Sequence, residues 1–281
     1  MPRRVADRFR TAFVTGAAEG LGRAMAEMLV GEGVKVWATS RDLSRLEPLV
    51  QAGGGQVIPL ALDLSDPAGC VAAFRSASDQ AGGTIDVLVN NGGYGIFGEF
   101  GSVPGEQWTR QLAAMLGGTL ALTHAAWNAW GTTHRGMLVN VSSLAAEFPI
   151  PFMSGYNAAK SGLSALTGSL MFETRGRAVS VIDFRPGDYR TGFNRSMHHR
   201  SAPGDSFVGP PAAVWKTIDA TLNAAPSPAR AARDLRRALL RGKNGIVRSG
   251  TFFQARLAPL LASLAPSGLQ RAVTARYFGL R

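Results

Sequence analysis

The sequence is poor in cysteine and has no long apolar run. Cys70 is the only cysteine, which excludes an internal disulfide and a metal site built from several cysteines. No stretch of about 18 or more apolar residues occurs, which argues against a membrane-spanning helix. The basic start of the chain lacks the apolar core and the small-residue cleavage site of a secretory signal. We therefore expect a cytoplasmic protein that contacts membranes at most peripherally.

Acidic residues are scarce near the C-terminal end of the chain. The formal net charge is +11, from 30 Lys and Arg against 19 Asp and Glu. Between Arg230 and Arg281, eleven basic residues stand against one acidic residue, Asp234. Such a block can meet anionic lipid, a phosphorylated ligand or nucleic acid, or it can be an ordinary solvated surface. We do not expect nucleic-acid binding, and we leave peripheral membrane contact open.

Short β-branched runs alternate with helical periodicity along the chain, and no internal repeat occurs. The predicted strands cover residues 10–15, 34–39, 56–62, 85–90, 136–141, 178–184 and 245–248. Helices are predicted over 22–31, 43–52, 68–81, 106–130 and 156–175, while 186–211 shows little periodicity. This alternation is typical of a parallel sheet with crossover helices. We predict an α/β fold with a single doubly wound Rossmann domain over residues 1–281, helices on both sheet faces and a helical, basic C-terminal extension.

A glycine-rich turn follows the first predicted strand. Residues Thr15–Gly22 read TGAAEGLG and open the first predicted helix. Glycines allow a tight turn and a close backbone approach to a pyrophosphate, and the helix start offers unpaired N–H groups and a favourable dipole. The strand before the turn and the helix after it favour this function over a purely structural turn. The predicted cofactor contacts here are Gly16, Glu19, Gly20, Leu21 and Gly22.

The end of the second predicted strand indicates which dinucleotide is bound. NAD-binding proteins usually place an acidic residue there to hold the ribose hydroxyls, whereas this strand ends in Ser40 and Arg41. An arginine can pair with a 2′-phosphate through charge-assisted hydrogen bonds. We therefore predict NADP(H) as the cofactor, with contacts from Ser40 and Arg41, although Asp42 beside them leaves NAD open.

Ser143, Tyr156 and Lys160 form the predicted catalytic constellation. Ser143 follows a predicted strand, and Tyr156 and Lys160 stand in the pattern YxxxK. Positions i and i+4 share a helix face, so the phenol and the ammonium group can converge on one site. A neighbouring ammonium should lower the pKa of the phenol from its usual value of about 10 toward the working pH. Ser143 can hydrogen-bond the substrate oxygen and stabilise its developing charge.

These motifs make the chain similar to the short-chain dehydrogenase/reductase family over residues 10–192. The resemblance implies that Asp63 contacts the adenine, that Lys160 also reaches the nicotinamide ribose, and that Thr191 contacts the nicotinamide amide or the phosphates. Residues 90–93 resemble the family's NNAG, and residues 185–191 resemble its PG…T segment. The remaining implied cofactor contacts are Tyr156 itself and Leu64, Asn90, Asn91, Gly92, Pro186 and Gly187. Family members are commonly dimers or tetramers, which we expect here too.

One position departs from the family pattern. The family commonly carries an asparagine on the long helix, where it kinks the helix and holds a water that relays protons to the lysine. Met115 stands at that position, and a thioether cannot replace the side-chain amide. The relay then runs through backbone carbonyls and water, or the enzyme is slow or specialised for a hydrophobic substrate that reaches Met115. Alternatively, the protein has lost turnover and serves as an NADP(H)-binding sensor or partner-binding protein.

The substrate side of the sequence indicates an apolar ligand. Residues 36–42 and 90–95 resemble the retinol and 17β-hydroxysteroid dehydrogenase branch, which implies a bulky apolar alcohol or ketone. Residues 192–214 correspond to the family's substrate loop; we read His198, His199 and Arg200 in it as solvated and expect no metal site. The extension spans residues 215–281. Apolar positions at helical spacing within it either close the pocket, form a subunit interface or contact a membrane surface; they are Phe252, Phe253, Leu257, Leu260, Leu261 and Leu264.

Overall fold

Seven parallel strands form the centre of the computed structural model, which describes residues 3–193, 197 and 207–280. Their order in the sheet is β3-β2-β1-β4-β5-β6-β7, and every neighbouring pair is parallel. The strands are β1 (Thr11–Val14), β2 (Lys35–Ser40), β3 (Val57–Ala61), β4 (Val87–Asn90), β5 (Gly136–Val141), β6 (Val179–Pro186) and β7 (Gly245–Ser249). The chain reverses its direction of winding between β3 and β4, which places a crevice beside β1 at the carboxyl ends of the strands. The predicted doubly wound α/β fold is confirmed.

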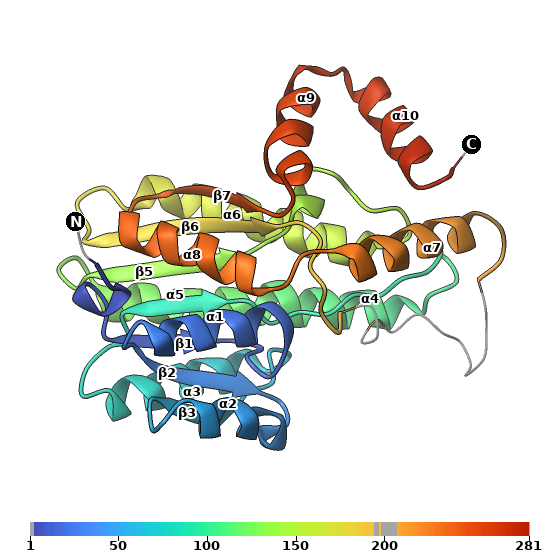
Figure 1. Cartoon of the computed structure of the whole chain (residues 1–281). Helices are drawn as coiled ribbons and strands as arrows, with labels where there is room; N and C mark the ends of the chain where they lie inside the picture. Colours follow the sequence, from blue (N-terminus) through green and yellow to red (C-terminus); the bar gives the residue numbers. More distant parts are fainter. Residues whose placement is uncertain (1–2, 194–196, 198–206, 281) are drawn as a thin grey trace.

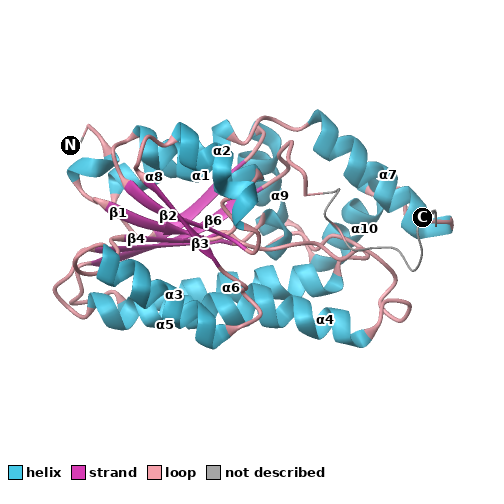
Figure 2. Cartoon of the chain, turned by 90° about the horizontal axis from the view of Figure 1, so that it is seen from below, coloured by secondary structure: helices cyan, strands magenta, loops and turns pink. Residues whose placement is uncertain are grey.

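Helices cover both faces of this sheet (Figure 1). They are α1 (Gly20–Gly31), α2 (Glu47–Ala52), α3 (Pro67–Gln80), α4 (Gly105–Leu112), α5 (Thr119–Trp130), α6 (Ser154–Glu173), α7 (Gly209–Ala224), α8 (Ala229–Arg241), α9 (Ala258–Leu264) and α10 (Ser267–Tyr277). Figure 2 shows α1, α2 and α8 over one face of the sheet and α3, α5 and α6 over the other. This arrangement buries the strands on both sides, as their continuous apolar runs require.

The alternation of side chains along β1 divides the core between the two faces. Ala12 and Val14 pack in a cluster that includes Met25 of α1 and Leu235 of α8. Phe13 points to the opposite face and joins a second cluster that contains Cys70 and Phe74 of α3. Successive residues of a strand point to opposite faces, so one short strand anchors both helical layers.

The predicted 43–52 helix is two elements in the structure. A 3-10 turn over Leu43–Leu46 precedes α2, and Pro48 stands in the first turn of that helix. Proline is accepted there because the first N–H groups of a helix have no partner within it. The other predicted elements agree with observed ones within a few residues, except the long helix over 106–130, and the C-terminal segment is helical as expected.

The predicted helix over 106–130 is interrupted in its middle. A π-helical turn covers Ala113–Gly118 between α4 and α5. A Cβ atom at Gly118 would lie 2.1 Å from the carbonyl oxygen of Leu64, so the backbone approaches the loop after β3 as closely as glycine alone permits. The widened turn places Met115 against this crevice rather than along a straight helix.

The C-terminal segment forms a pair of helices that stands away from the sheet. A π-helical turn (Phe253–Leu257) leads without a break into α9, so residues 252–264, which the apolar spacing predicts as helical, lie in one continuous helical segment, and Pro266 separates α9 from α10. Figure 1 shows the pair as an arch beyond β7, with the end of the chain returning toward α7. Phe278 packs there with Val214 and Ile218. Among the described residues, no helix combines the length and the apolarity that crossing a bilayer demands.

Candidate active site

A cavity of about 1200 Å³ opens at the carboxyl ends of the strands. Its wall combines the glycine turn, the end of β2, the loops after β3, β4 and β5, the start of α6 and the segment after β6. The helices α9 and α10 complete one side through apolar residues such as Leu261 and Val273. The position is the one where doubly wound sheets bind ligands.

The glycine turn has the conformation that a close phosphate approach demands. Gly16 and Gly20 have φ angles of +65° and +59°, a region that side chains with a Cβ rarely adopt. A Cβ at Gly22 would lie 2.2 Å from the carbonyl oxygen of Gly16 and 2.4 Å from Nδ2 of Asn91. Gly22 therefore lets α1 approach the turn, while Gly16, Glu19, Gly20 and Leu21 line the cavity.

Asn91 and Thr15 tie the glycine turn to the loop after β4. Asn91 Nδ2 donates to the carbonyl oxygen of Thr15 at 3.0 Å, and Thr15 Oγ1 accepts from the backbone N–H groups of Asn91 and Gly92 at 2.9 and 2.8 Å. A Cβ at Gly92 would lie 2.6 Å from Leu64. These contacts fix the position of the glycine turn relative to the loop after β4.

Two cations lie beside the glycine turn: Arg41 directly after β2 and Arg45 in the following 3-10 turn. Ser40 and Arg41 line the cavity, and so does Arg45, whose guanidinium pairs with the Glu19 carboxylate at 2.7 Å. Asp42 accepts hydrogen bonds from Ser44 and caps the following turn. One oxygen of its carboxylate, Oδ1, thus accepts both of these local hydrogen bonds. Arg45 was not predicted, because only the short 3-10 turn brings it next to Glu19.

The structure corrects the prediction for Asn90. Its side chain is 3% exposed and donates to Thr123 Oγ1 at 3.0 Å and to Asn140 Oδ1 at 2.8 Å. Asn90 therefore bridges β4, β5 and α5 inside the core and does not line the cavity.

Asp63 and Leu64 line the cavity as predicted. The hydrogen bonds that Asp63 accepts from Ser65 lower the pKa of its carboxyl.

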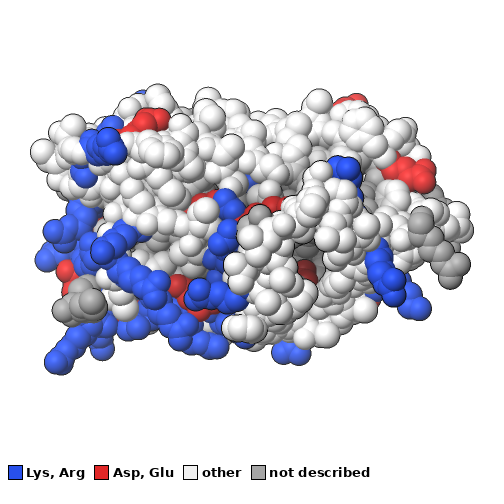
Figure 3. All heavy atoms as spheres, turned by 90° about the horizontal axis from the view of Figure 1, so that it is seen from above, with Lys and Arg blue, Asp and Glu red and all other residues white. Residues whose placement is uncertain are grey.

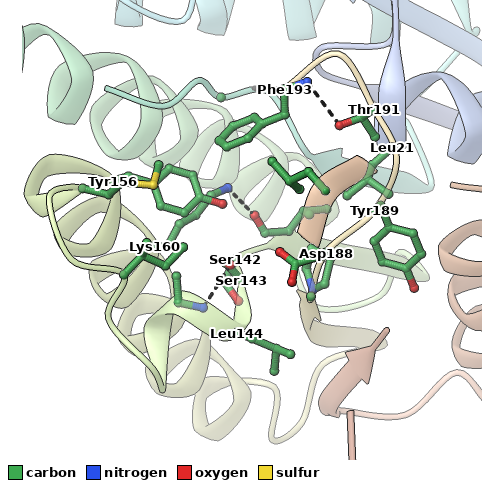
Figure 4. Close-up of a pocket in the computed structure, with 18 of the residues that line it drawn as sticks. Leu21, Ser142, Ser143, Leu144, Tyr156, Lys160, Asp188, Tyr189, Thr191 and Phe193 are labelled. Carbon is green, nitrogen blue, oxygen red and sulfur yellow. Dashed lines mark hydrogen bonds between the residues drawn. The ribbon is translucent and has the colours of Figure 1, made fainter. Parts of the chain in front are cut away.

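Ser143, Tyr156 and Lys160 meet on one wall of the cavity (Figure 4). Ser143 follows β5, and its side-chain oxygen accepts from the backbone N–H of Ala145 at 3.0 Å. Tyr156 and Lys160 stand one turn apart on α6, and Lys160 Nζ donates to the carbonyl oxygen of Val141 at 2.7 Å. The ammonium nitrogen lies 5.8 Å from the centre of the Tyr156 ring.

The pKa of Tyr156 moves against the expectation from the sequence. Burial raises it to about 12, a hydrogen bond with Ser143 works in the opposite direction, and the charge of Asp188 raises it further. The predicted lowering by Lys160 is wrong for this structure, because burial disfavours the phenolate and Lys160 is not among the groups that lower the pKa of Tyr156. The phenol is therefore protonated throughout the neutral range, which is the form that gives a proton to a carbonyl oxygen.

Burial lowers the pKa of Lys160 to about 8, and the charge of Asp183 counteracts part of that effect. Asp183 is 1% exposed and accepts hydrogen bonds from the hydroxyls of Ser142 and Ser164. Arg185 donates to the same carboxylate from its Nε at 2.8 Å. A buried carboxylate thus stands behind the catalytic wall, held by the residue that precedes Ser143.

The segment after β6 brings three predicted residues and one unexpected residue to the cavity. Pro186, Gly187 and Thr191 line the cavity as predicted, and so does Asp188, which sequence analysis did not select. Gln254 of the C-terminal π-helical turn donates from Nε2 to Asp188 Oδ2. The two residues are 66 positions apart in the chain, so no local sequence pattern predicts their contact.

Met115 lines the same cavity and is 2% exposed. Its Cε atom would lie 3.1 Å from a Cβ atom at Gly93. The side chain therefore fills space beside the loop after β4.

Part of the predicted substrate loop falls outside the described residues. These predictions concern His198, His199 and Arg200. Within the part of the chain that the structure describes, no three His, Cys, Asp or Glu side chains are grouped as metal ligands.

Comparisons with known proteins find similar sequences and a similar solved structure. The model of the short chain dehydrogenase family matches residues 10–202. An uncharacterized oxidoreductase from Myxococcus xanthus is 35% identical over 182 residues, covering 64% of this chain and 72% of that protein. Dehydrogenase/reductase SDR family member 7B from Bos taurus is 28% identical over 272 residues, covering 94% of this chain and 80% of that protein. The crystal structure of a short-chain dehydrogenase from Streptomyces avermitilis has a TM-score of 0.76 at 27% identity, covering 92% of this chain and 96% of that one.

Proposed function

Because the chain belongs to the short-chain dehydrogenase family, we propose that it is an NADP(H)-dependent oxidoreductase that interconverts a hydrophobic alcohol and its ketone or aldehyde. The observation that carries this proposal is the meeting of Ser143, Tyr156 and Lys160 in one cavity with the glycine turn. Its wall offers a phosphate cradle, a proton donor and an oxyanion partner within one enclosed space.

The chain's own residues support reduction as follows. The Tyr156 phenol gives its proton to the substrate oxygen, and the Ser143 hydroxyl donates a hydrogen bond to the same oxygen as negative charge develops there. Lys160, when protonated, favours the phenolate that remains after proton transfer. A bound nicotinamide supplies or accepts the hydride. In the reverse direction the phenolate takes the proton of the alcohol.

Two arginines support NADP(H) as the cofactor. Arg41, directly after β2, and Arg45, in the following 3-10 turn, both border the cavity, and an NAD-binding protein usually carries an acidic residue at the end of this strand to hold the ribose. Ser40 carries no charge there, and its hydroxyl oxygen accepts a hydrogen bond from the backbone N–H of Asp42 at 3.2 Å. Guanidinium groups suit phosphate because they bind it through paired, charge-assisted hydrogen bonds.

The apolar wall supports a hydrophobic substrate. The side of the cavity beyond the catalytic residues is formed by aliphatic and aromatic side chains from several elements, among them Phe148, Ile150, Met153, Phe193, Met197, Ile218, Leu261 and Val273. The rings of Tyr156 and Phe193 lie 5.5 Å apart. A substrate placed at Ser143 and Tyr156 would bury its carbon skeleton against this wall.

Replacing the phenol tests the reaction. Tyr156→Phe should lower kcat/KM for NADPH-dependent reduction of a hydrophobic ketone by about 10²–10⁴-fold, because the general acid is lost. NADPH binding, followed by its fluorescence, should persist in the variant and serves as the control for folding. Unchanged turnover with Tyr156→Phe would rule out the proposed mechanism.

Replacing the two arginines tests the cofactor. Arg41→Ala combined with Arg45→Ala should reduce the preference for NADPH over NADH by roughly 10–100-fold, the value of one or two charge-assisted hydrogen bonds. Arg75→Ala, an exposed arginine on α3, is the matched control and should leave the ratio unaltered. A wild-type protein that prefers NADH would contradict the assignment.

A second candidate function rests on Met115. A protein without the relay asparagine can bind NADP(H) tightly and act as a sensor or partner-binding protein without turnover. Such a protein would bind NADPH yet reduce no ketone across a broad panel, whereas Tyr156-dependent turnover of any ketone excludes it.

A further inference from the structure

An acidic side chain, Asp188, lines the cavity beside the catalytic residues. Asp188 follows Gly187 at the end of β6 and lines the cavity with the catalytic residues. Figure 4 shows its carboxyl group on the wall that also carries Ser142 and Ser143. The charge of Asp188 acts on the phenol of Tyr156, so the two groups lie within electrostatic reach of each other.

Gln254 fixes the orientation of this carboxylate and leaves its own amide oxygen without a hydrogen bond among the described residues. Its Nε2 donates to Asp188 Oδ2, while its Oε1 is buried without a hydrogen-bond partner among the described residues. The amide is packed against two glycines, since Cβ atoms at Gly187 and Gly250 would lie 2.8 and 3.1 Å from Oε1. A buried, unpaired amide oxygen in a folded protein calls for an explanation, and holding Asp188 in place supplies one.

No cation neutralises Asp188 among the described residues. Gln254 provides its one hydrogen bond, no ion pair involves it, and burial raises the pKa of its carboxyl. The nearby arginines are engaged elsewhere: Arg185 pairs with Asp183 and Glu147, and Arg248 pairs with Glu147. The remaining lone pairs of the carboxylate therefore lack a donor, which a ligand in the cavity can bring.

We infer that Asp188 is a specificity-determining residue that binds a hydrogen-bond donor on the substrate, a hydroxyl or a protonated amine, close to the reacting carbonyl. The inference deepens the proposed function and rests on it. The substrate is then a largely apolar carbonyl compound with one polar donor group next to its reaction centre. A substrate with a carboxylate at that place is disfavoured, because two like charges would share a desolvated space.

Matched substrates test this subsite. A hydrophobic ketone is compared with the same skeleton carrying a hydroxyl, an amino or a carboxylate group on the carbon beside the carbonyl. Wild-type protein should show kcat/KM at least about tenfold higher for a donor-bearing ketone than for the plain one, the value of one charge-assisted hydrogen bond. Asp188→Leu should abolish this ratio and still reduce the plain ketone.

Asp188→Asn separates the two donor chemistries. The asparagine oxygen still accepts from a hydroxyl but carries no charge for an ammonium group. Retained selectivity for the hydroxyketone with loss of selectivity for the aminoketone would identify the ammonium contact as ionic. Asp79→Leu, which removes an exposed acidic residue on α3, is the control and should leave all ratios unchanged.

A binding experiment keeps this inference separate from the reaction itself. Donor-bearing ketones should raise the Tm of the NADPH-saturated wild type more than the plain ketone does, and this difference should vanish in Asp188→Leu. If wild type turns over no ketone but shows this binding pattern, the proposed reaction fails and the subsite stands. Equal ratios and equal Tm shifts in wild type and Asp188→Leu would overturn the subsite whether or not turnover is found.

Discussion

Lys160 is a catalytic residue whose charge depends on its surroundings. Burial lowers the pKa of Lys160 to about 8, and the charge of Asp183 partly offsets this lowering. A lysine whose folded pKa lies below its ordinary value loses its proton as the pH rises through that folded pKa. Reduction that depends on a charged Lys160 is therefore present below about pH 8 and is lost above it.

Neutralising Asp183 should lower the pH above which reduction is lost. In Asp183→Asn the pKa of Lys160 falls, so the alkaline limb of the kcat/KM profile should shift to lower pH. The measurement is the pH dependence of ketone reduction under saturating NADPH. Glu147→Gln is the matched control, because Glu147 binds Arg185 and Arg248 in the same network but is not among the charges that act on Lys160. An alkaline limb that stays in place in Asp183→Asn would show that Lys160 does not set it.

At the level of elements, the π-helical turn at Ala113–Gly118 distorts the long helix where the family's asparagine was expected to kink it. The family's asparagine is absent, yet the helix is still distorted at the same place. A π-helical turn widens the backbone and shifts its hydrogen bonds by one residue, so the distortion does not depend on a side-chain amide. This supports a relay through the backbone, with Met115 serving as an apolar part of the wall.

Restoring the asparagine tests that interpretation. Met115→Asn should change kcat by less than about threefold and destabilise the protein by about 1–3 kcal/mol, since it buries an amide without known partners. Denaturant unfolding and steady-state kinetics measure the two effects. Met115→Leu keeps the side chain apolar and should cost less than about 1.5 kcal/mol. A tenfold rise in kcat for Met115→Asn would instead mean that the missing amide limits the reaction.

At the scale of the whole molecule, the arch of α9 and α10 leaves apolar side chains on the surface. Phe252, Leu260 and Leu264 are 73%, 60% and 79% exposed. The opposite side of the arch borders the cavity through residues such as Leu261 and Leu269. Figure 3 shows basic side chains gathered at the end of the molecule that carries α8, beside a largely uncharged surface. An apolar arch next to a basic region suits the surface of an anionic bilayer.

Vesicle flotation tests this contact. The protein should float with vesicles that contain phosphatidylserine at low salt, less so at high salt, and Leu260→Asp combined with Leu264→Asp should abolish flotation. Phe172→Asp is the control, since Phe172 of α6 is 78% exposed but lies outside the arch. If the arch variant changes the oligomeric state and leaves flotation intact, the apolar face is a subunit interface of the predicted dimer or tetramer.

Local sequence patterns were sufficient for much of the architecture. The periodicity of apolar residues located all seven strands, and the glycine turn and the YxxxK spacing identified the cofactor crevice and the catalytic wall. These features depend on neighbours a few positions apart, such as Gly16 and Gly22 or Tyr156 and Lys160. The spacing of Tyr156 and Lys160 follows directly from the helical repeat, and the glycines mark a turn whose backbone conformation few other residues adopt.

Contacts between distant segments were decided only by the tertiary structure. Asn90 looked like a cofactor ligand and is a buried bridge to Thr123 and Asn140, while the Asp188–Gln254 pair joins segments that share no sequence pattern. The pKa of Tyr156 likewise rose where spacing alone predicted a fall. Burial and long-range pairing depend on how the whole chain is packed, so the sequence by itself determined the fold and the reacting groups, and the tertiary structure determined their charge state and the polar residue that faces the substrate.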